Sequence, residues 1–340
     1  MLTVQAAAQL IAQGELVAFP TETVYGLGAD ALRDEAVAKI FAAKGRPSDH
    51  PLIVHVSDAA AAEHFAAEIP DFARQLMAAF WPGPLTVIVP RKAGVAAASA
   101  GGQDSIGLRC PSHRIARELL QACESLGVKG VSAPSANKFG KVSPTTAAHV
   151  REEFGGSIPV LDGGACEVGI ESTIVDCTRG APVLLRPGTL TRAQLEAAMG
   201  CDLLSNDEQT VQTRRRVIAQ NASNLSFEAP AAPRASGTLE SHYAPRAPLR
   251  LMDAKALQTA LDLLGPDAKN IAVYARAALK IPSSYLMIRR MPDDALATAQ
   301  QLFAVLREFD AKDVKLIWVE SVPEDVAWDG VRDRLARAAS

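Results

Sequence analysis

The sequence predicts an α/β protein with two folded units, a larger one built on a mixed sheet and a smaller, doubly wound one. At 340 residues the chain is too long for a single hydrophobic core of ordinary size. Short apolar runs alternate with amphipathic segments over the first two thirds of the chain. This pattern stops at about residue 203 and resumes at about 249. We therefore expect a first domain at 1–202, a linker at 203–248 and a small α/β domain at 249–340.

Periodicity and helix-ending glycines predict the individual elements. Gly14 and Gly127 end two of the expected helices, and a third helix begins near Asp34. Apart from the helix that begins near Asp34, the expected helices lie at 3–13, 112–126, 145–154, 191–199, 254–264, 294–309 and 329–338. The expected strands lie at 16–19, 52–56, 85–89, 106–110, 130–133, 160–161, 173–175, 183–185, 249–252, 271–274, 286–288 and 316–319.

Composition and charge narrow the class of protein. Hydrophobic residues make up 48% and charged residues 21%, as in ordinary globular proteins, and the net charge of −3 predicts no general basic surface for nucleic acid. We expect no membrane contact, because no apolar run approaches the roughly 20 residues of a membrane span. The first residues have no secretory pattern, so we expect a cytoplasmic location. The cysteines form no CxxC pair and are predicted to be reduced structural thiols: Cys110, Cys123, Cys166, Cys177 and Cys201.

Standard nucleotide, metal and hydrolase motifs are absent from the sequence. There is no GxxxxGK[ST] loop, no HExxH spacing and no GxSxG. Gly26 and Gly28 lack the third glycine of a dinucleotide-binding turn. Residues 135–138 fit the SxxK pattern of penicillin-recognising hydrolases, but the companion SDN and KTG boxes are missing.

Four segments concentrate hydroxyls, cations, glycine and proline where predicted strands or helices end. They lie at 20–28, 44–47, 132–145 and 169–188. In the first we expect a polar turn followed by glycines that allow close backbone approach. Each segment alone is also explained by a capped turn or by a cation at a helix end. Together they provide cations, hydroxyls and backbone donors without a general-base triad, which suits phosphoryl or nucleotidyl transfer.

These segments also carry a family resemblance. About residues 10–190 resemble the YrdC-like family in six motifs: PTETVYGLG, KxRP, FWPGPLT, GLRCP, SAPSAN and GIESTIVD. SGTLESHYAP at 236–245, together with the domain after it, resembles the long form of threonylcarbamoyl-AMP synthases. The resemblance implies a YrdC-like twisted mixed sheet and a Rossmann-like C-terminal domain.

The resemblance also implies a reaction. L-threonine, bicarbonate and ATP, with Mg²⁺ accompanying the triphosphate, give threonylcarbamoyl-AMP and pyrophosphate. Downstream tRNA threonylcarbamoyltransferase proteins then use the product to form N6-threonylcarbamoyladenosine at position 37 of tRNA, so any contact with tRNA is indirect. As implied by the family pattern, no residue is a metal ligand.

The family pattern carries roles over to single residues of this sequence. The residues expected to bind threonine are Thr23, Tyr25, His55, Arg109, Ala133 and Ser172. Those expected to bind ATP are Arg46, His50, Ser105, Ser135, Ser143, Arg186 and Tyr243. Those expected to be catalytic are Lys44, Arg46, Ser135 and Asn137.

Some features of the site follow from these roles. We expect Lys44 and Arg46 to be exposed to a cleft, and Tyr243 to close over the nucleotide as part of a lid. Two departures from the family pattern affect the nucleotide side. His50 stands where the family often has Asn, and residues 236–241 replace the more basic PGMKYR of many long forms.

Two other functions remain open at the level of sequence. One is an RNA-binding module, because YrdC-like domains have a concave basic surface. The other is a carbamoyltransferase of hydrogenase maturation, although this chain lacks the acylphosphatase part and the Cys-rich zinc modules of such proteins.

Overall fold

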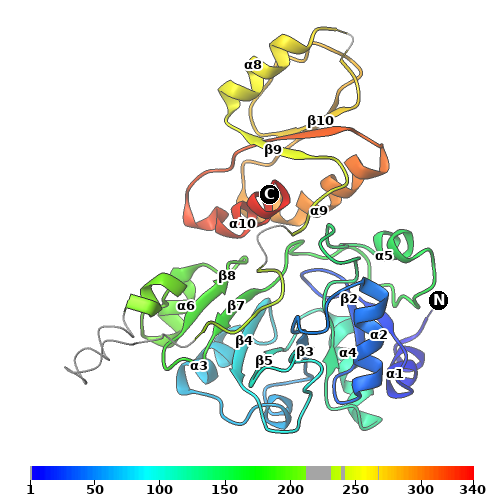
Figure 1. Cartoon of the computed structure of the whole chain (residues 1–340), viewed down its shortest axis with the longest axis vertical. Helices are drawn as coiled ribbons and strands as arrows, with labels where there is room; N and C mark the ends of the chain where they lie inside the picture. The colour runs from blue at the N-terminus through cyan, green and yellow to red at the C-terminus, as the bar shows by residue number, and fades with distance from the viewer. Residues whose placement is uncertain (1, 212–230, 239–241, 267) are drawn as a thin grey trace.

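Two β-sheets carry the fold (Figure 1). The computed structural model describes residues 2–211, 231–238, 242–266 and 268–340. The larger sheet has the strand order β1-β2-β6-β3-β5-β4-β7-β8, and it is mixed because β3/β5 and β4/β7 are parallel while the other pairs are antiparallel. Its strands are β1 (Val17–Phe19), β2 (Gly26–Asp30), β3 (Ile53–His55), β4 (Leu85–Pro90), β5 (Ser105–Arg109), β6 (Val131–Ser132), β7 (Thr173–Asp176) and β8 (Val183–Arg186).

Helices surround the larger sheet, and their ends follow ordinary capping rules. Thr146 and Thr191 accept backbone N–H groups at two helix starts, while Gly45 and Gly155 end helices in the left-handed conformation. The helices are α1 (Val4–Ala12), α2 (Asp34–Lys44), α3 (Asp71–Phe80), α4 (Arg114–Ser125), α5 (Ala147–Phe154) and α6 (Arg192–Met199), with a 3₁₀ turn η1 (Ala61–His64).

The C-terminal domain, from β9 to α10, is built on four parallel strands in the order β11-β10-β12-β9. Helices α9 and α10 lie on the face turned toward the larger sheet, and α8 lies on the opposite face (Figure 1). This doubly wound arrangement, together with the mixed larger sheet, confirms the predicted fold class. Its elements are β9 (Leu249–Met252), α8 (Ala254–Leu264), β10 (Ile271–Ala275), β11 (Met287–Arg290), α9 (Ala295–Ala311), β12 (Leu316–Glu320), η2 (Val326–Trp328) and α10 (Asp329–Ala338).

One apolar cluster joins the C-terminal domain to the rest of the chain. It contains Val24, Val142 and Ile170 from the first domain and continues through Phe303 and Leu306 of α9. Burial of such side chains is the main favourable term in folding. The two parts of the molecule therefore share a core instead of meeting at a wet, polar boundary.

The structure departs from the sequence predictions in three places. Strand β2, which contains Gly26 and Gly28, falls where no strand was predicted. A Cβ at Gly28 would lie 2.8 Å from the Phe19 ring, so the glycine lets neighbouring strands pack closely. Helix α3 falls where no helix was predicted, and Val160 makes only a single bridge to Ala18 in place of a strand.

The predicted linker is partly bound to the first domain. Leu204 forms a bridge with Val183 beside the edge of the larger sheet. Residues 231–238 and 242–248, which we call the crossing segment, lead from there to β9, and the 203–248 boundaries stay a prediction. The three arginines at 214–216 and the altered positions 239–241 lie outside the described residues.

Two further expectations bear on the class of protein. Among the described residues, no helix is long and apolar enough to cross a membrane. All five cysteines are free, and all except Cys201 are buried, which fits the expected structural thiols. Burial raises the pKa of the Cys110 thiol to about 11, so that thiol is not poised as a nucleophile.

Candidate active site

A polar cavity lies between the larger sheet and the crossing segment. The space left inside it is about 30 Å³, enough for one or two water molecules. A nucleotide therefore enters only if part of the wall moves. The lining residues come from strand ends and loops far apart in the sequence: Thr21, Thr23, Val24, Gly26, Lys44, Arg46, Ile53, His55, Arg109, Ala133, Pro134, Ser135, Asn137, Phe139, Gly140, Glu171, Ser172, Arg186, Ser236, Gly237, His242 and Tyr243.

Arg109 dominates one end of the cavity. Its Nη2 donates to Glu22 Oε1 at 2.6 Å and its Nη1 donates to Thr23 Oγ1 at 2.9 Å. Arg109 ends strand β5. His55 ends β3, the parallel neighbour of β5, and lies directly opposite Arg109 in that strand pair. Burial, and then the charge of Arg109, lower the pKa of His55 to about 3, so its imidazole is neutral. This end of the cavity thus offers one arginine, already paired with the Glu22 carboxylate, beside neutral hydroxyl and imidazole groups.

Lys44 is an internal support of the cavity wall. It ends helix α2, is only 2% exposed, and donates from Nζ to the carbonyl oxygens of Ser135 and Asn137 at 2.5 Å each. Burial, followed by the charge of Arg46, lowers the pKa of the Lys44 ammonium well below its usual value. The expectation that Lys44 is exposed to a cleft is therefore wrong, because the ammonium must pair with carbonyls once it is removed from water.

Arg46 and Arg186 form the cationic end of the cavity. Arg46 is 7% exposed, again less than predicted, because its Nη2 donates to Pro51 O at 2.9 Å inside the protein. Arg186 ends β8 and donates to Ser172 O and, through Nη1, to Ser236 O at 2.7 Å. Both guanidiniums contact Ser236 of the crossing segment, since Arg46 Nη2 also lies 3.4 Å from its Oγ. Two cations that converge on neutral backbone and hydroxyl oxygens form an anion-binding geometry.

Three buried polar atoms that belong to cavity-lining residues have no hydrogen-bond partner within the described residues. They are Arg46 Nε, His55 Nδ1 and Asn137 Oδ1. Buried polar groups are normally satisfied, so unpartnered groups in one cavity indicate a ligand that supplies the missing contacts. Arg46 and Asn137 belong to the segments 44–47 and 132–145, for which the sequence predicted a part in phosphoryl or nucleotidyl transfer.

The structure brings most of the predicted site residues to this cavity, but four of them do not line it. The Tyr25 hydroxyl donates to Gly164 O at 2.8 Å, away from the cavity, and its predicted place close to threonine stays a prediction. Ser143 is fully buried and its hydroxyl donates to Glu171, which makes it a second layer behind the wall. His50 packs edge-on against Phe139.

Ser105 lies in a neighbouring hollow on the face of the larger sheet. This hollow shares Ile53 and Ser236 with the cavity, and its floor is apolar, with Ile88 and Ile174. Ala235 of the crossing segment packs on that floor. The predicted role of Ser105 beside the nucleotide thus requires a ligand that extends from the cavity into this hollow.

Several residues of the site were not predicted. Glu22 and Glu171 lie inside the motifs that carry the resemblance, and both carboxylates are buried in ion pairs. Phe139 and His242 form an aromatic wall beside Tyr243. The ring centroids of Phe139 and His242 are 6.2 Å apart, and those of His242 and Tyr243 are 4.2 Å apart. Both glutamates belong to the sequence motifs, but nothing in the local sequence pattern indicated which arginines they pair with.

The residues of the cavity do not form a metal centre of their own. Across the described ranges, no group of three or more His, Cys, Asp or Glu side chains is arranged to hold a metal ion. The carboxylates of Glu22 and Glu171 are both engaged with arginines. A Mg²⁺ ion here would therefore take its oxygen ligands mainly from a triphosphate and water, as this ion commonly does.

Comparisons with known proteins agree with these features. A family profile described as "Telomere recombination", for Sua5, YciO and YrdC proteins, matches residues 9–188, and one described as "Threonylcarbamoyl-AMP synthase, C-terminal domain" matches 190–340. The threonylcarbamoyl-AMP synthase of Pyrococcus abyssi is 36% identical, over 99% of this chain and 94% of its own length. That of Bacillus subtilis is 37% identical, over 98% and 92%. The crystal structure of P. abyssi Sua5 complexed with L-threonine matches with a TM-score of 0.82 and 35% identity, over 99% of this chain and 94% of that one.

Proposed function

The chain belongs to the threonylcarbamoyl-AMP synthase family, and we propose that its cavity binds L-threonine at the Arg109 end and ATP at the Arg46–Arg186 end. It is a nucleotidyltransferase that makes threonylcarbamoyl-AMP, the first step in forming the threonylcarbamoyl modification of tRNA. The observation that carries the proposed arrangement is the set of three unpartnered buried polar atoms among the residues that line one cavity.

In this proposal, threonine lies where Thr23, His55, Ala133 and Ser172 meet Arg109. The substrate carboxylate pairs with the Arg109 guanidinium, which favours planar, two-oxygen partners. The neutral His55 leaves no second positive charge to repel the substrate ammonium group. Hydroxyl-bearing neighbours suit the side chain of threonine.

The phosphates of ATP take the place of the Ser236 oxygens that now contact Arg46 and Arg186. The adenine ring extends into the hollow beside Ser105, once Ala235 leaves its apolar floor. Residues of the crossing segment, including Tyr243, then close again over the bound nucleotide. Such closure would keep water from a product that hydrolyses easily.

The reaction takes place between threonine at the Arg109 end of the cavity and ATP at the Arg46–Arg186 end. Bicarbonate takes up a proton and loses water, giving carbon dioxide. The uncharged amine of threonine attacks the carbon dioxide and releases a proton, so a carbamate forms with one water molecule as by-product. A carbamate oxygen attacks the α-phosphorus of ATP, the bond to the β-phosphate oxygen breaks, and pyrophosphate leaves with the negative charge. Mg²⁺ supplies part of the charge neutralisation when it accompanies the triphosphate. Arg46 and Arg186 stabilise the charge that builds up on the phosphate oxygens, Lys44 holds the 135–137 loop in place, and the Asn137 side chain donates to Lys138 O and Lys141 O just after it.

We place this enzyme in the cytoplasm, with its product passed to tRNA threonylcarbamoyltransferase proteins. The burial of Lys44, Arg46 and Arg186 counts against the RNA-binding alternative, because these cations are not displayed on the surface where an RNA backbone could reach them. The carbamoyltransferase alternative has no support in the profiles that match this chain.

The experiment that tests the function measures pyrophosphate release by the purified full chain. Release is expected only when ATP, L-threonine and bicarbonate are all present, and mass spectrometry should detect threonylcarbamoyl-AMP. Serine in place of threonine serves as a control for the side-chain pocket. ATP turnover that ignores threonine would remove the threonine assignment.

A further inference from the structure

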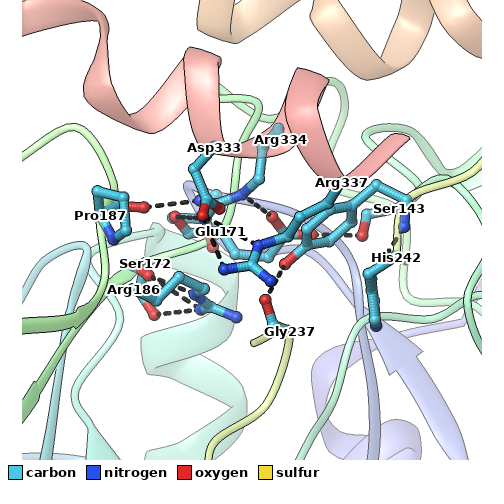
Figure 2. A network of polar contacts seen from close by, with 12 residues as sticks. Ser143, Glu171, Ser172, Arg186, Pro187, Gly237, His242, Asp333, Arg334 and Arg337 are labelled. Carbon is cyan, nitrogen blue, oxygen red and sulfur yellow. Dashed lines mark hydrogen bonds and ion pairs between the residues drawn. The ribbon is translucent and has the colours of Figure 1, made fainter. Parts of the chain in front are cut away.

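Helix α10 of the C-terminal domain inserts a fully buried arginine into the wall of the active site (Figure 2). Arg334 donates from Nε to Glu171 Oε2 at 2.9 Å and from Nη2 to Glu171 O at 3.0 Å. Its Nη1 donates to Pro187 O at 2.6 Å. Glu171 lines the cavity, so one residue of the C-terminal domain holds both the side chain and the backbone of a cavity-wall residue.

The same guanidinium also contacts the wall that the crossing segment supplies. Its carbon lies 5.4 Å from the centroid of the Tyr243 ring, within the range of a cation–π contact. The Tyr243 hydroxyl in turn donates to Gly237 O at 3.4 Å, and its ring lies 5.4 Å from Phe303 of α9. Arg334 therefore contacts two residues that line the cavity, Glu171 and Tyr243.

The charge of Glu171 is what makes this contact matter for a phosphate ligand. Both carboxylate oxygens are used, Oε2 by Arg334 and Oε1 by the Ser143 hydroxyl. Burial alone raises the pKa of this carboxyl, but the charges of Arg334 and Arg186 outweigh burial and hold the pKa below its usual value. A buried carboxylate without Arg334 would attract Arg186 and repel phosphate, since charges interact strongly where water is excluded.

The position of α10 is fixed by close backbone contact. A Cβ on Gly330 would lie 2.4 Å from Gly188 O, and a Cβ on Gly169 would lie 2.5 Å from Ala299 O of α9. Both contacts fall on the loops that carry Glu171 and follow Arg186. The C-terminal domain thus has little room to shift against the site, and the guanidinium of Arg334 is held in one place.

We propose that Arg334 is a positioning residue for the nucleotide, which cancels the charge of Glu171 and leaves Arg186 free to bind phosphate. The C-terminal domain then contributes to ATP binding without touching ATP. This inference rests on the proposed function, because it assumes that Arg186 meets a phosphate group.

The test uses the full-length chain and compares Arg334→Gln, Glu171→Gln with Arg334→Gln, and the control Arg332→Gln. Arg332 lies on the same helix but pairs with Asp329 and the 323–325 turn. KM for ATP and for threonine are measured separately by pyrophosphate release, with thermal unfolding as a check of folding. We expect Arg334→Gln to raise the KM for ATP about tenfold and that for threonine about twofold or less. The control should keep both values.

The double variant separates charge cancellation from simple support. With both charges removed, the KM for ATP should recover to within about threefold of wild type. A double variant as poor as Arg334→Gln, or a wild-type KM for ATP in Arg334→Gln, overturns the inference. If Arg334→Gln does not fold, the double variant alone decides, because it removes the buried carboxylate together with its arginine, while Asp333, the other partner of Arg334, keeps its ion pair with Arg337. A wild-type chain without threonine-dependent pyrophosphate release would instead count against the proposed function.

Discussion

Arg109 and Glu22 form a buried ion pair at the threonine end of the cavity. Nη2 and Oε1 are 2.6 Å apart, and the two side chains are 5% and 4% exposed. Glu22 Oε2 also accepts the backbone N–H of Ser112 at 3.1 Å. The cation proposed for the substrate carboxylate therefore already has one anionic partner, which fixes its orientation before any ligand arrives.

Replacing Glu22 with Gln should destabilise the protein and make it more dependent on threonine. The buried Arg109 would lose its counterion, at a cost of about 3 kcal/mol in the free energy of unfolding. Saturating threonine should raise the free energy of unfolding of Glu22→Gln by more than it raises that of the wild type, because the threonine carboxylate replaces the missing charge. Denaturant unfolding with and without threonine measures this.

A matched control for that experiment is Asp104→Asn, at an exposed carboxylate 3.9 Å from Arg91. Its effect should stay within about 0.5 kcal/mol. Equal threonine stabilisation in wild type and Glu22→Gln would remove Arg109 from the carboxylate site.

Lys44 and Arg46 should fail in different ways when substituted. Lys44→Met leaves Asn137 O without a donor and Ser135 O with only the Asn137 N–H, so the free energy of unfolding should fall by about 1–3 kcal/mol and both substrates should bind less well. Arg46→Gln should raise the KM for ATP about tenfold and leave the threonine affinity intact. Separate KM measurements and unfolding curves distinguish the two patterns, and identical patterns would show that both residues act only through the fold.

His55 should make the protein less stable in mild acid. Its pKa is about 3 in the folded state, against an ordinary value of 6.5. Above the ordinary value both states are neutral and the contribution to stability is complete. As the pH falls below 6.5, only the unfolded state takes up the proton, and stability is lost until the folded pKa is reached.

The expected loss from this one histidine is about 2 kcal/mol between about pH 8 and pH 5. Urea unfolding at several pH values should show it as a slope that becomes shallower in His55→Gln. Parallel curves for the two proteins would mean that His55 is readily protonated in the fold.

Gly330→Ala should weaken the contact between α10 and the active site. Alanine normally stabilises a helix interior relative to glycine, by roughly 0.5–1 kcal/mol. Here its Cβ would meet Gly188 O at 2.4 Å, so we expect the opposite sign, with the unfolding midpoint lowered and the KM for ATP raised. An increase in stability with unchanged KM would show that the interface gives way at low cost.

The sequence predicted α10 at the residues where it occurs, because its apolar face and length are local properties. The sequence also predicted which segments gather at the site. Both the hydroxyls and cations at strand ends and the family motifs are visible in the sequence itself. It did not predict that Glu171 meets Arg334, a partner 163 positions away, or that Lys44 is buried. Those facts depend on how two domains pack, and local periodicity carries no information about such packing. Strand β2 was missed for a similar reason, because the close neighbour of its glycines, Phe19, lies on another strand.

The apolar cluster that runs from Val24 through Tyr243 to Phe303 has a consequence for how the chain unfolds. Separating the two parts would expose that surface on both of them at once. Loss of the C-terminal domain and loss of an ordered catalytic pocket are then one event, and heating should melt the molecule in a single cooperative step. A chain interrupted before β9 would expose this apolar face to water, so we expect it to be less stable than the full chain and prone to self-association.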